Sequence, residues 1–151
     1  MTPQTLAAQS ALTALQGTLE WLEQRLGLLA EAALRFDVAE VIALTAAIDR
    51  GQDELHTRQL DCANALSAAQ AVDPEGARVT LRPLRVDVRA RAVRLQEVQR
   101  STRQIVERAR SFASAHARSL VSAPSPTVGY SRRGAAAAAP SLAGALHDAT
   151  V

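Results

Sequence analysis

The stretch LTALQGTLEWLEQRLGLLAEAALRF, residues 12–36, carries the strongest structural pattern in this chain. Its apolar residues follow one another at alternating intervals of three and four positions: Leu12, Leu15, Leu19, Leu22, Leu26, Leu29, Ala33 and Phe36. That alternation is typical of helices that pack side by side, because it places every member on one face of an α-helix. Thr2 followed by Pro3 resembles a helix start. We therefore predict a first helix over residues 3–36.

Two further helical patterns follow. The second occupies residues 38–72, and its apolar positions are Val41, Leu44, Ile48, Leu55, Cys62, Leu66 and Ala69. Gly51 interrupts it, and a glycine inside a helix costs about 1 kcal/mol relative to alanine, so we expect flexibility or a close helix approach there. The third occupies residues 80–121, and its apolar positions are Leu81, Leu84, Val88, Leu95, Val98, Thr102, Ile105, Ala109 and Phe112. We expect Pro83 in its first turn, where a proline costs least.

The segment Asp73-Pro74-Glu75-Gly76 is the clearest turn signal in the chain, and we expect it to reverse the chain before the third helix. Beyond Val121 the composition changes to Ser, Pro, Gly, Arg and Ala, a mixture with too little apolar variety to form a core. We predict a helical domain over residues 1–121 and a flexible tail over residues 122–151. Within that tail, Leu142 and Leu146 are spaced to form one short helical face.

Composition agrees with an all-α fold. Of the 151 residues, 48% are hydrophobic but only 3% are aromatic, and a supply of Ala, Leu and Val suits helix packing better than a β-sheet. The length corresponds to one domain. We predict an antiparallel bundle or hairpin of three long, coiled-coil-like helices.

Charge is distributed unevenly along the chain. Residues 1–75 hold 11 acidic residues and 4 arginines, whereas residues 76–151 hold 4 acidic residues and 13 arginines. The second half is therefore expected to pack against the first. Four arginines share one heptad position of the third helix and predict a basic stripe: Arg82, Arg89, Arg103 and Arg110. The stripe has three interpretations: ion pairing with Glu20, Glu23, Asp53 or Asp61, binding to an acidic partner, or simple exposure to solvent. Nucleic-acid binding is disfavoured, because the net charge of the chain is only +2.

Residues that carry chemistry are sparse. His56, His116 and His147 are scattered, and no phosphate loop, nucleophile elbow or zinc spacing occurs. Asp49, Asp53 and Glu54 resemble half of a di-metal site, but Thr57 stands where such a site places its histidine, so a solvated acidic face is the better interpretation. We expect no enzymatic activity, no cofactor and no metal.

The cellular location is predicted from two observations. The single cysteine, Cys62, lies at an apolar helical position and fits a reducing compartment. No stretch approaches the roughly 20 apolar residues of a membrane-spanning helix, and the N-terminus has no signal-peptide pattern. We expect a soluble, cytoplasmic protein without membrane insertion.

Apolar residues outside the packing seams are candidates for a binding surface. Trp21 and Leu28 lie seven positions apart on a flank of the first seam, so another polypeptide or a third helix of the same chain is expected to cover them. Ile105, Phe112 and Leu120, next to the tail, are suitably spaced to anchor a guest helix.

The arrangement resembles the FlgN family of flagellar export chaperones. The resemblance rests on the Leu-rich first helix ending in residues 31–37 (EAALRFD), the segment 41–48, a long third helix and the tail element 127–134 (TVGYSRRG). It spans nearly the whole chain. The sequence departs from the family in having no Lys, in the alanine run at 135–139 and in Pro83.

The resemblance implies a cytoplasmic chaperone that binds the C-terminal amphipathic helices of hook–filament junction proteins and delivers them for type III export, with export-apparatus components as further candidate partners. The candidate partner-binding residues are Trp21, Leu28, Val98, Ile105, Phe112, Leu120 and Tyr130. The alternative is a structural coiled-coil or adaptor protein that self-associates through the seam of residues 12–36. The sequence leaves the oligomeric state open.

Overall fold

A computed structural model describes residues 2–122, 129–130 and 136–137 of the chain. Its elements are helix α1 (Pro3–Leu34), helix α2 (Val38–Val72), helix α3 (Pro74–Ser122), and the short strands β1 (Gly129–Tyr130) and β2 (Ala136–Ala137), which pair antiparallel. The predicted all-α fold of three long helices is confirmed. The expectation of a flexible tail, and of a helical face at Leu142 and Leu146, falls largely outside the described residues.

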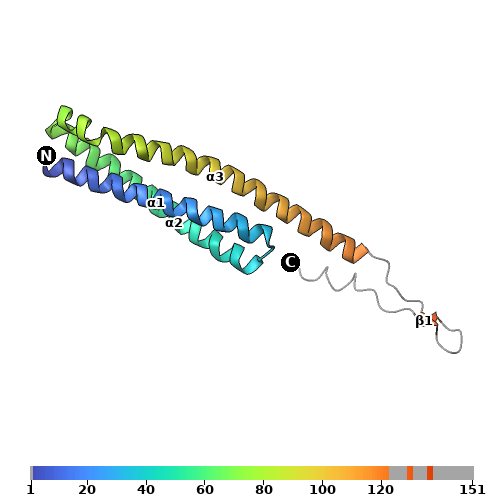
Figure 1. The fold of residues 1–151 in the computed structure, drawn as a ribbon. Coiled ribbons are helices and arrows are strands. Elements are labelled where there is room, and N and C mark those ends of the chain that lie inside the picture. Colours follow the sequence, from blue (N-terminus) through green and yellow to red (C-terminus); the bar gives the residue numbers. More distant parts are fainter. Residues whose placement is uncertain (1, 123–128, 131–135, 138–151) are drawn as a thin grey trace. The chain divides into compact units, whose positions relative to one another are not determined.

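Packing divides the chain into two units, residues 1–109 and 110–151. In the first unit, α1 and α2 run antiparallel and lie side by side, and α3 runs along them as far as Ala109 (Figure 1). The first helix begins as its sequence predicts, because Thr2 Oγ1 accepts a hydrogen bond from the Thr5 N–H at 3.2 Å and Pro3 occupies the first turn.

The connection between α1 and α2 is a tight turn, and the predicted extension of the first helix to Phe36 is wrong. The helix ends at Leu34 and Phe36 adopts a left-handed backbone with φ of 56°. The Phe36 N–H donates to the Ala33 carbonyl at 3.1 Å, and the Asp37 N–H donates to the Ala32 carbonyl at 3.0 Å. These two bonds satisfy the last carbonyls of α1 in a Schellman motif. Asp37 then caps α2 by accepting from the Glu40 N–H.

Asp73 alone separates α2 from α3, so the third helix begins at Pro74 and not at residue 80 as predicted. The Asp73 carboxylate accepts from the Gly76 N–H at 2.9 Å, and Pro74 occupies the first helical position. Because α3 starts earlier, Pro83 lies inside the helix and not in its first turn. An interior proline costs about 3 kcal/mol, which burial of Leu81 on the core face of the same segment helps to offset.

Side chains from all three helices form two core clusters. The first cluster contains Ala8, Leu12, Leu15, Cys62, Ala69, Ala77 and Leu81. The second contains Leu19, Leu22, Leu26, Ile48 and Leu95. Leucines of the predicted seam of residues 12–36 supply both clusters, which confirms that seam as the packing face of α1. The prediction fails at its last position, because Phe36 lies beyond the helix and is about half exposed.

Gly51 lies at a position where α1 and α2 approach each other closely. It is buried, and a Cβ placed there would collide with the Trp21 ring and lie 2.9 Å from Leu22 Cδ2. Of the two sequence expectations, the structure supports the close approach. The interruption in the α2 pattern thus has a packing cause.

Candidate functional site

The apolar flank of α1 is covered in part by its own chain. Trp21 is half-buried against the second core cluster, and its ring lies over Gly51 of α2. The Arg25 guanidinium lies 5.3 Å from the centre of the ring, within the range of a cation–π contact. Leu28, seven positions along the same flank, remains 40% exposed. This flank therefore offers Leu28, rather than Trp21, as its accessible apolar group.

Two of the predicted partner-binding residues on α3 are half-buried. Val98 packs against the second core cluster, and Ile105 is half-buried further along the helix. Between them, Thr102 Oγ1 donates a hydrogen bond to the Leu26 carbonyl of α1 at 3.3 Å. Val98 and Ile105 therefore belong largely to the packing of α3 in the first unit.

The end of α3, in the second unit, is exposed throughout. Every side chain from Arg110 to Val121 is exposed, and Phe112 and Leu120 have exposed fractions of 63% and 67%. Phe112 stacks on His116, with ring centroids 6.3 Å apart and an interplanar angle of 4°. Phe112, His116 and Leu120 follow one another at intervals of four, so they lie on one helix face. That face is an accessible apolar surface.

Tyr130, the remaining predicted contact, lies in strand β1, where its backbone pairs with Ala136 of β2. Its side chain and most of the surrounding tail lie outside the described residues. The structure therefore brings Phe112 and Leu120 to one surface and places Trp21 and Val98 in the packing of the first unit.

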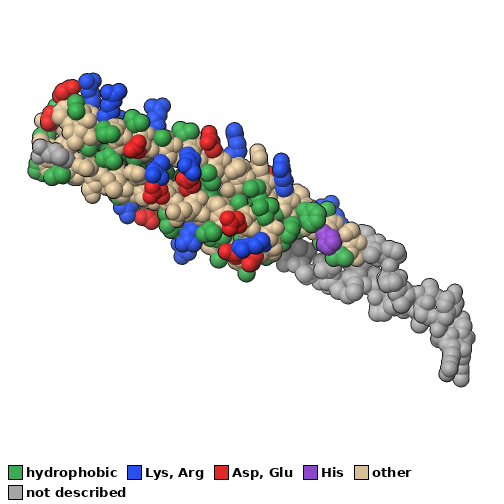
Figure 2. All heavy atoms as spheres, viewed as in Figure 1, with side chains coloured by type: hydrophobic (Ala, Val, Ile, Leu, Met, Phe, Trp, Pro, Cys, Tyr) green, Lys and Arg blue, Asp and Glu red, His purple; other side chains and the backbone are tan. Residues whose placement is uncertain are grey.

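The charge complementarity predicted for the two halves is present, and the arginines that provide it lie outside the stripe of residues 82, 89, 103 and 110. Arg91 pairs with Glu20 at 2.6 Å and Arg94 pairs with Glu23 at 2.7 Å, which joins α3 to α1. Of the predicted stripe, Arg103 pairs with Glu107 of its own helix. Of the three interpretations of the stripe, pairing with the acidic residues of α1 and α2 is not seen among the described residues, because Arg91 and Arg94 lie on the side of α3 nearer α1 and make these pairs instead. Figure 2 shows arginine side chains spaced along the α3 edge of the molecule.

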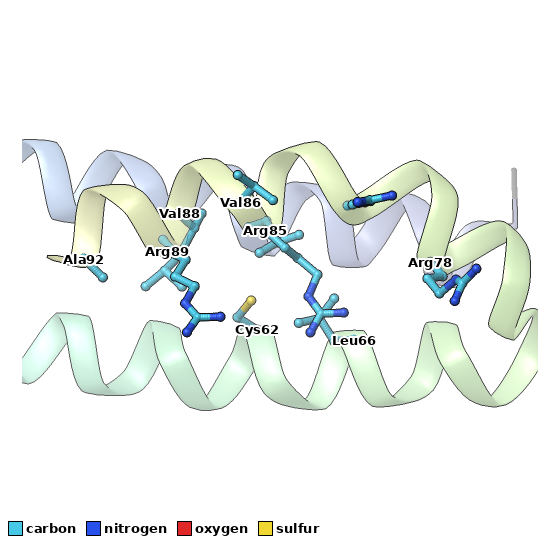
Figure 3. Close-up of a pocket in the computed structure, with 11 residues that line it drawn as sticks. Cys62, Leu66, Arg78, Arg85, Val86, Val88, Arg89 and Ala92 are labelled. Atoms are coloured by element: carbon cyan, nitrogen blue, oxygen red, sulfur yellow. The ribbon is translucent and has the colours of Figure 1, made fainter. Parts of the chain in front are cut away.

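A groove between α2 and α3, which the sequence analysis did not identify, has a volume of about 720 Å³. Its lining comes from all three helices: Leu12, Leu15, Cys62, Leu66, Arg78, Arg82, Arg85, Val86, Val88, Arg89 and Ala92. Cys62 and Leu66 point from α2 toward α3, and the side chains of Arg85 and Arg89 reach from α3 toward α2 (Figure 3). One sequence signal points to it, because four arginines, Arg78, Arg82, Arg85 and Arg89, alternate at intervals of four and three beside the apolar seam.

Electrostatics in the groove are dominated by arginine. Arg78 pairs with Glu75 at 3.1 Å, whereas Arg82, Arg85 and Arg89 form no ion pair with any carboxylate of the described residues. Burial raises the pKa of the Cys62 thiol, and the positive charge of Arg85 opposes that rise. The thiol is therefore neutral at physiological pH and behaves as part of the apolar floor.

Groups suited to metal binding do not converge in the part of the chain that the structure describes. Among residues 2–122, 129–130 and 136–137, no cluster of three or more His, Cys, Asp or Glu side chains is placed to hold a metal ion. Glu54 of the acidic α2 segment pairs with Arg58 at 3.0 Å, and Asp49 and Asp53 are exposed. None of the described helices is long and apolar enough to cross a membrane.

Comparisons of the chain with models of protein families, with curated protein sequences and with solved structures found no match.

Proposed function

We propose that this chain is a cytoplasmic export chaperone that binds the C-terminal amphipathic helices of hook–filament junction proteins and delivers them for type III export. The observation that carries the proposal is the exposed apolar face at the end of α3, formed by Phe112 and Leu120. The resemblance in sequence to the FlgN family suggests the class of guest. Catalysis has no part in the proposed activity.

The exposed face suits capture of a helix. Burying a Phe or Leu side chain contributes about 1.5–3 kcal/mol, so two such residues at helical spacing provide a substantial share of the binding energy of a weak, reversible complex. An amphipathic guest helix presents apolar residues at intervals of three and four, which match this spacing. Reversible binding is what delivery requires, because the guest must leave at the export apparatus.

Isothermal titration calorimetry with synthetic C-terminal helices of hook–filament junction proteins tests the proposal. We expect binding by the full chain and a loss of affinity of about tenfold or more in the Phe112→Ser/Leu120→Ser variant, because two buried apolar contacts are lost. Leu60→Ser is a matched control, because Leu60 is 54% exposed on α2 and its replacement should leave binding unchanged. Absence of binding by the unaltered chain would refute the proposal.

A second candidate is a self-associating structural coiled-coil or adaptor protein, but not one that pairs through the predicted seam of residues 12–36, because the leucines of that seam are buried or half-buried within the chain. The observation in its favour is a row of three exposed valines on α3 at heptad intervals, Val79, Val86 and Val93. It predicts a tight homodimer in sedimentation velocity that Val86→Glu disrupts and that candidate guest helices leave unchanged. The chaperone proposal predicts that guest helices bind whatever the oligomeric state of the free chain.

A further inference from the structure

The groove between α2 and α3 combines an apolar floor with a row of arginines that have no carboxylate partner among the described residues. Leu12, Leu15 and Cys62, which are buried, and Leu66, which is half-buried, line it from α1 and α2. Arg82, Arg85 and Arg89 line it from α3, and none pairs with an acidic residue of the described chain. Arginine is well suited to bidentate pairing with carboxylates, so the groove presents basic groups beside an apolar surface.

We infer that this groove binds an acidic amphipathic helix of another polypeptide. The carboxylates of that helix pair with Arg82, Arg85 and Arg89, and its apolar residues cover the floor around Leu66. This site lies within residues 1–109 and is independent of the proposed function, which rests on residues 110–121.

Dimensions agree with a short helical segment. The lining residues of α3 run from Arg78 to Ala92, which spans about 21 Å at 1.5 Å per residue. A partner helix of about 15 residues, or four turns, has the same length.

A peptide fits this groove better than a nucleic acid does. The lining contains no aromatic residue on which bases could stack, and its floor is aliphatic. A strand of nucleic acid would pair its phosphates with the arginines but leave the floor uncovered. An acidic amphipathic helix satisfies both parts of the groove.

A second copy of this chain fits less well. Its acidic surface around Asp49 and Asp53 of α2 has Ile42 and Leu60 as the nearest exposed large apolar residues on either side along the helix. These two residues are 18 positions apart, or about 27 Å along a helix, which is longer than the arginine row of the groove. The carboxylates and the apolar residues of α2 therefore do not match the groove together.

Fluorescence anisotropy with labelled model peptides tests the inference on the full chain. The probe is a helix of about 15 residues with leucines at intervals of three and four and glutamates elsewhere; a second probe carries lysine in place of glutamate. We expect the acidic probe to bind and the basic probe not to bind. Affinity should fall by about tenfold or more in Arg85→Glu/Arg89→Glu, and by less than about threefold in the matched control Arg100→Glu/Arg108→Glu.

A second readout reports on the groove itself. Cys62 is the single cysteine of the chain and is buried at the groove floor, so a colorimetric disulfide reagent reaches it only when the groove opens, and the bound acidic probe should slow that reaction. If Arg85→Glu/Arg89→Glu loses its helical circular dichroism, Arg85→Gln/Arg89→Gln replaces it, since this variant removes the charges without reversing them. The glutamine variant is expected to weaken the binding of the acidic probe to an intermediate degree.

Several outcomes would overturn the inference. The first is failure of the acidic probe to bind, and the second is an equal loss of affinity in the groove variant and the matched control. Displacement of the probe by an oligothymidylate that itself binds at least as tightly would assign the groove to polyanions. Sedimentation velocity could also show that the chain is a homodimer and that Arg85→Glu/Arg89→Glu dissociates it. That result would assign the groove to a second copy of the chain.

Discussion

Replacing Gly51 with alanine should destabilise the protein, although the same change at an exposed helical glycine should stabilise it. Gly51 lies buried where α1 and α2 meet, and an added Cβ would collide with the Trp21 ring and approach Leu22. Gly17 and Gly27 of α1 have no heavy atom within 4 Å of the position of an added Cβ. The three glycines therefore share a helical backbone and differ in the space around them.

The magnitude follows from two opposing effects. Alanine gains about 1 kcal/mol of helix propensity over glycine at any of the three positions. At Gly51 the added methyl group also incurs the cost of overpacking, about 1–3 kcal/mol, because the rigid Trp21 ring must swing outward. Both Gly51→Ala and Gly17→Ala gain the same helix propensity, so this gain cancels when their unfolding free energies are subtracted. The difference that remains should equal the steric cost at Gly51.

Urea denaturation followed by far-ultraviolet circular dichroism measures this difference. Gly17→Ala and Gly27→Ala should raise the midpoint, and Gly51→Ala should lie below both. In a Trp21→Leu background the penalty at Gly51 should shrink, because the closest obstacle is gone while Leu22 remains at 2.9 Å. An equal stabilisation by all three alanine substitutions would refute the close approach of α1 and α2 at this position.

Three further predictions concern the core, the ion pairs and the buried thiol. Leu22 is fully buried, so Leu22→Ala should lower the free energy of unfolding by about 2–5 kcal/mol. Leu60 is exposed, so Leu60→Ala should lower it by less than about 0.5 kcal/mol. Chemical denaturation compares the two variants. Replacing Arg91 and Arg94 with glutamine should cost about 0–1 kcal/mol each, because both ion pairs are partly exposed, and repeating the denaturation at high salt should reduce the loss. The pKa of Cys62 is raised in the folded chain, so the unfolded chain loses its thiol proton first as pH rises, and the free energy of unfolding should decline above the ordinary thiol pKa. A Cys62→Ala variant that shows the same decline between neutral and alkaline pH would contradict the attribution of the decline to Cys62.

Periodicity was sufficient to predict the helices and most of the core. A heptad seam constrains which face of a helix is buried, and Leu12 to Leu26 of α1 are buried as their spacing indicates. The ends of the helices were harder to predict, because they depend on local capping. At Phe36 a left-handed residue completes a Schellman motif without a glycine, and at Asp73 one residue serves both to end α2 and to cap α3.

The candidate sites were less accessible from sequence. Phe112 and Leu120 are exposed, as a partner contact requires. The same spacing placed Val98 among the partner contacts, although it is half-buried against the second core cluster. A heptad pattern identifies a shared face and does not tell whether a neighbouring helix covers it. The groove around Cys62 was missed for a related reason, because its arginines and its floor come from different helices and only the packing brings them together.

Amide hydrogen exchange over residues 110–121 tests the proposed capture of a guest helix most directly. Mass spectrometry would follow exchange in the free chain and in the chain saturated with a C-terminal helix of a hook–filament junction protein. Because every side chain from Arg110 to Val121 is exposed, we predict fast exchange in the free chain and clear slowing in the complex, with residues 42–50 of α2 unchanged. Identical exchange over residues 110–121 in both states would contradict the account.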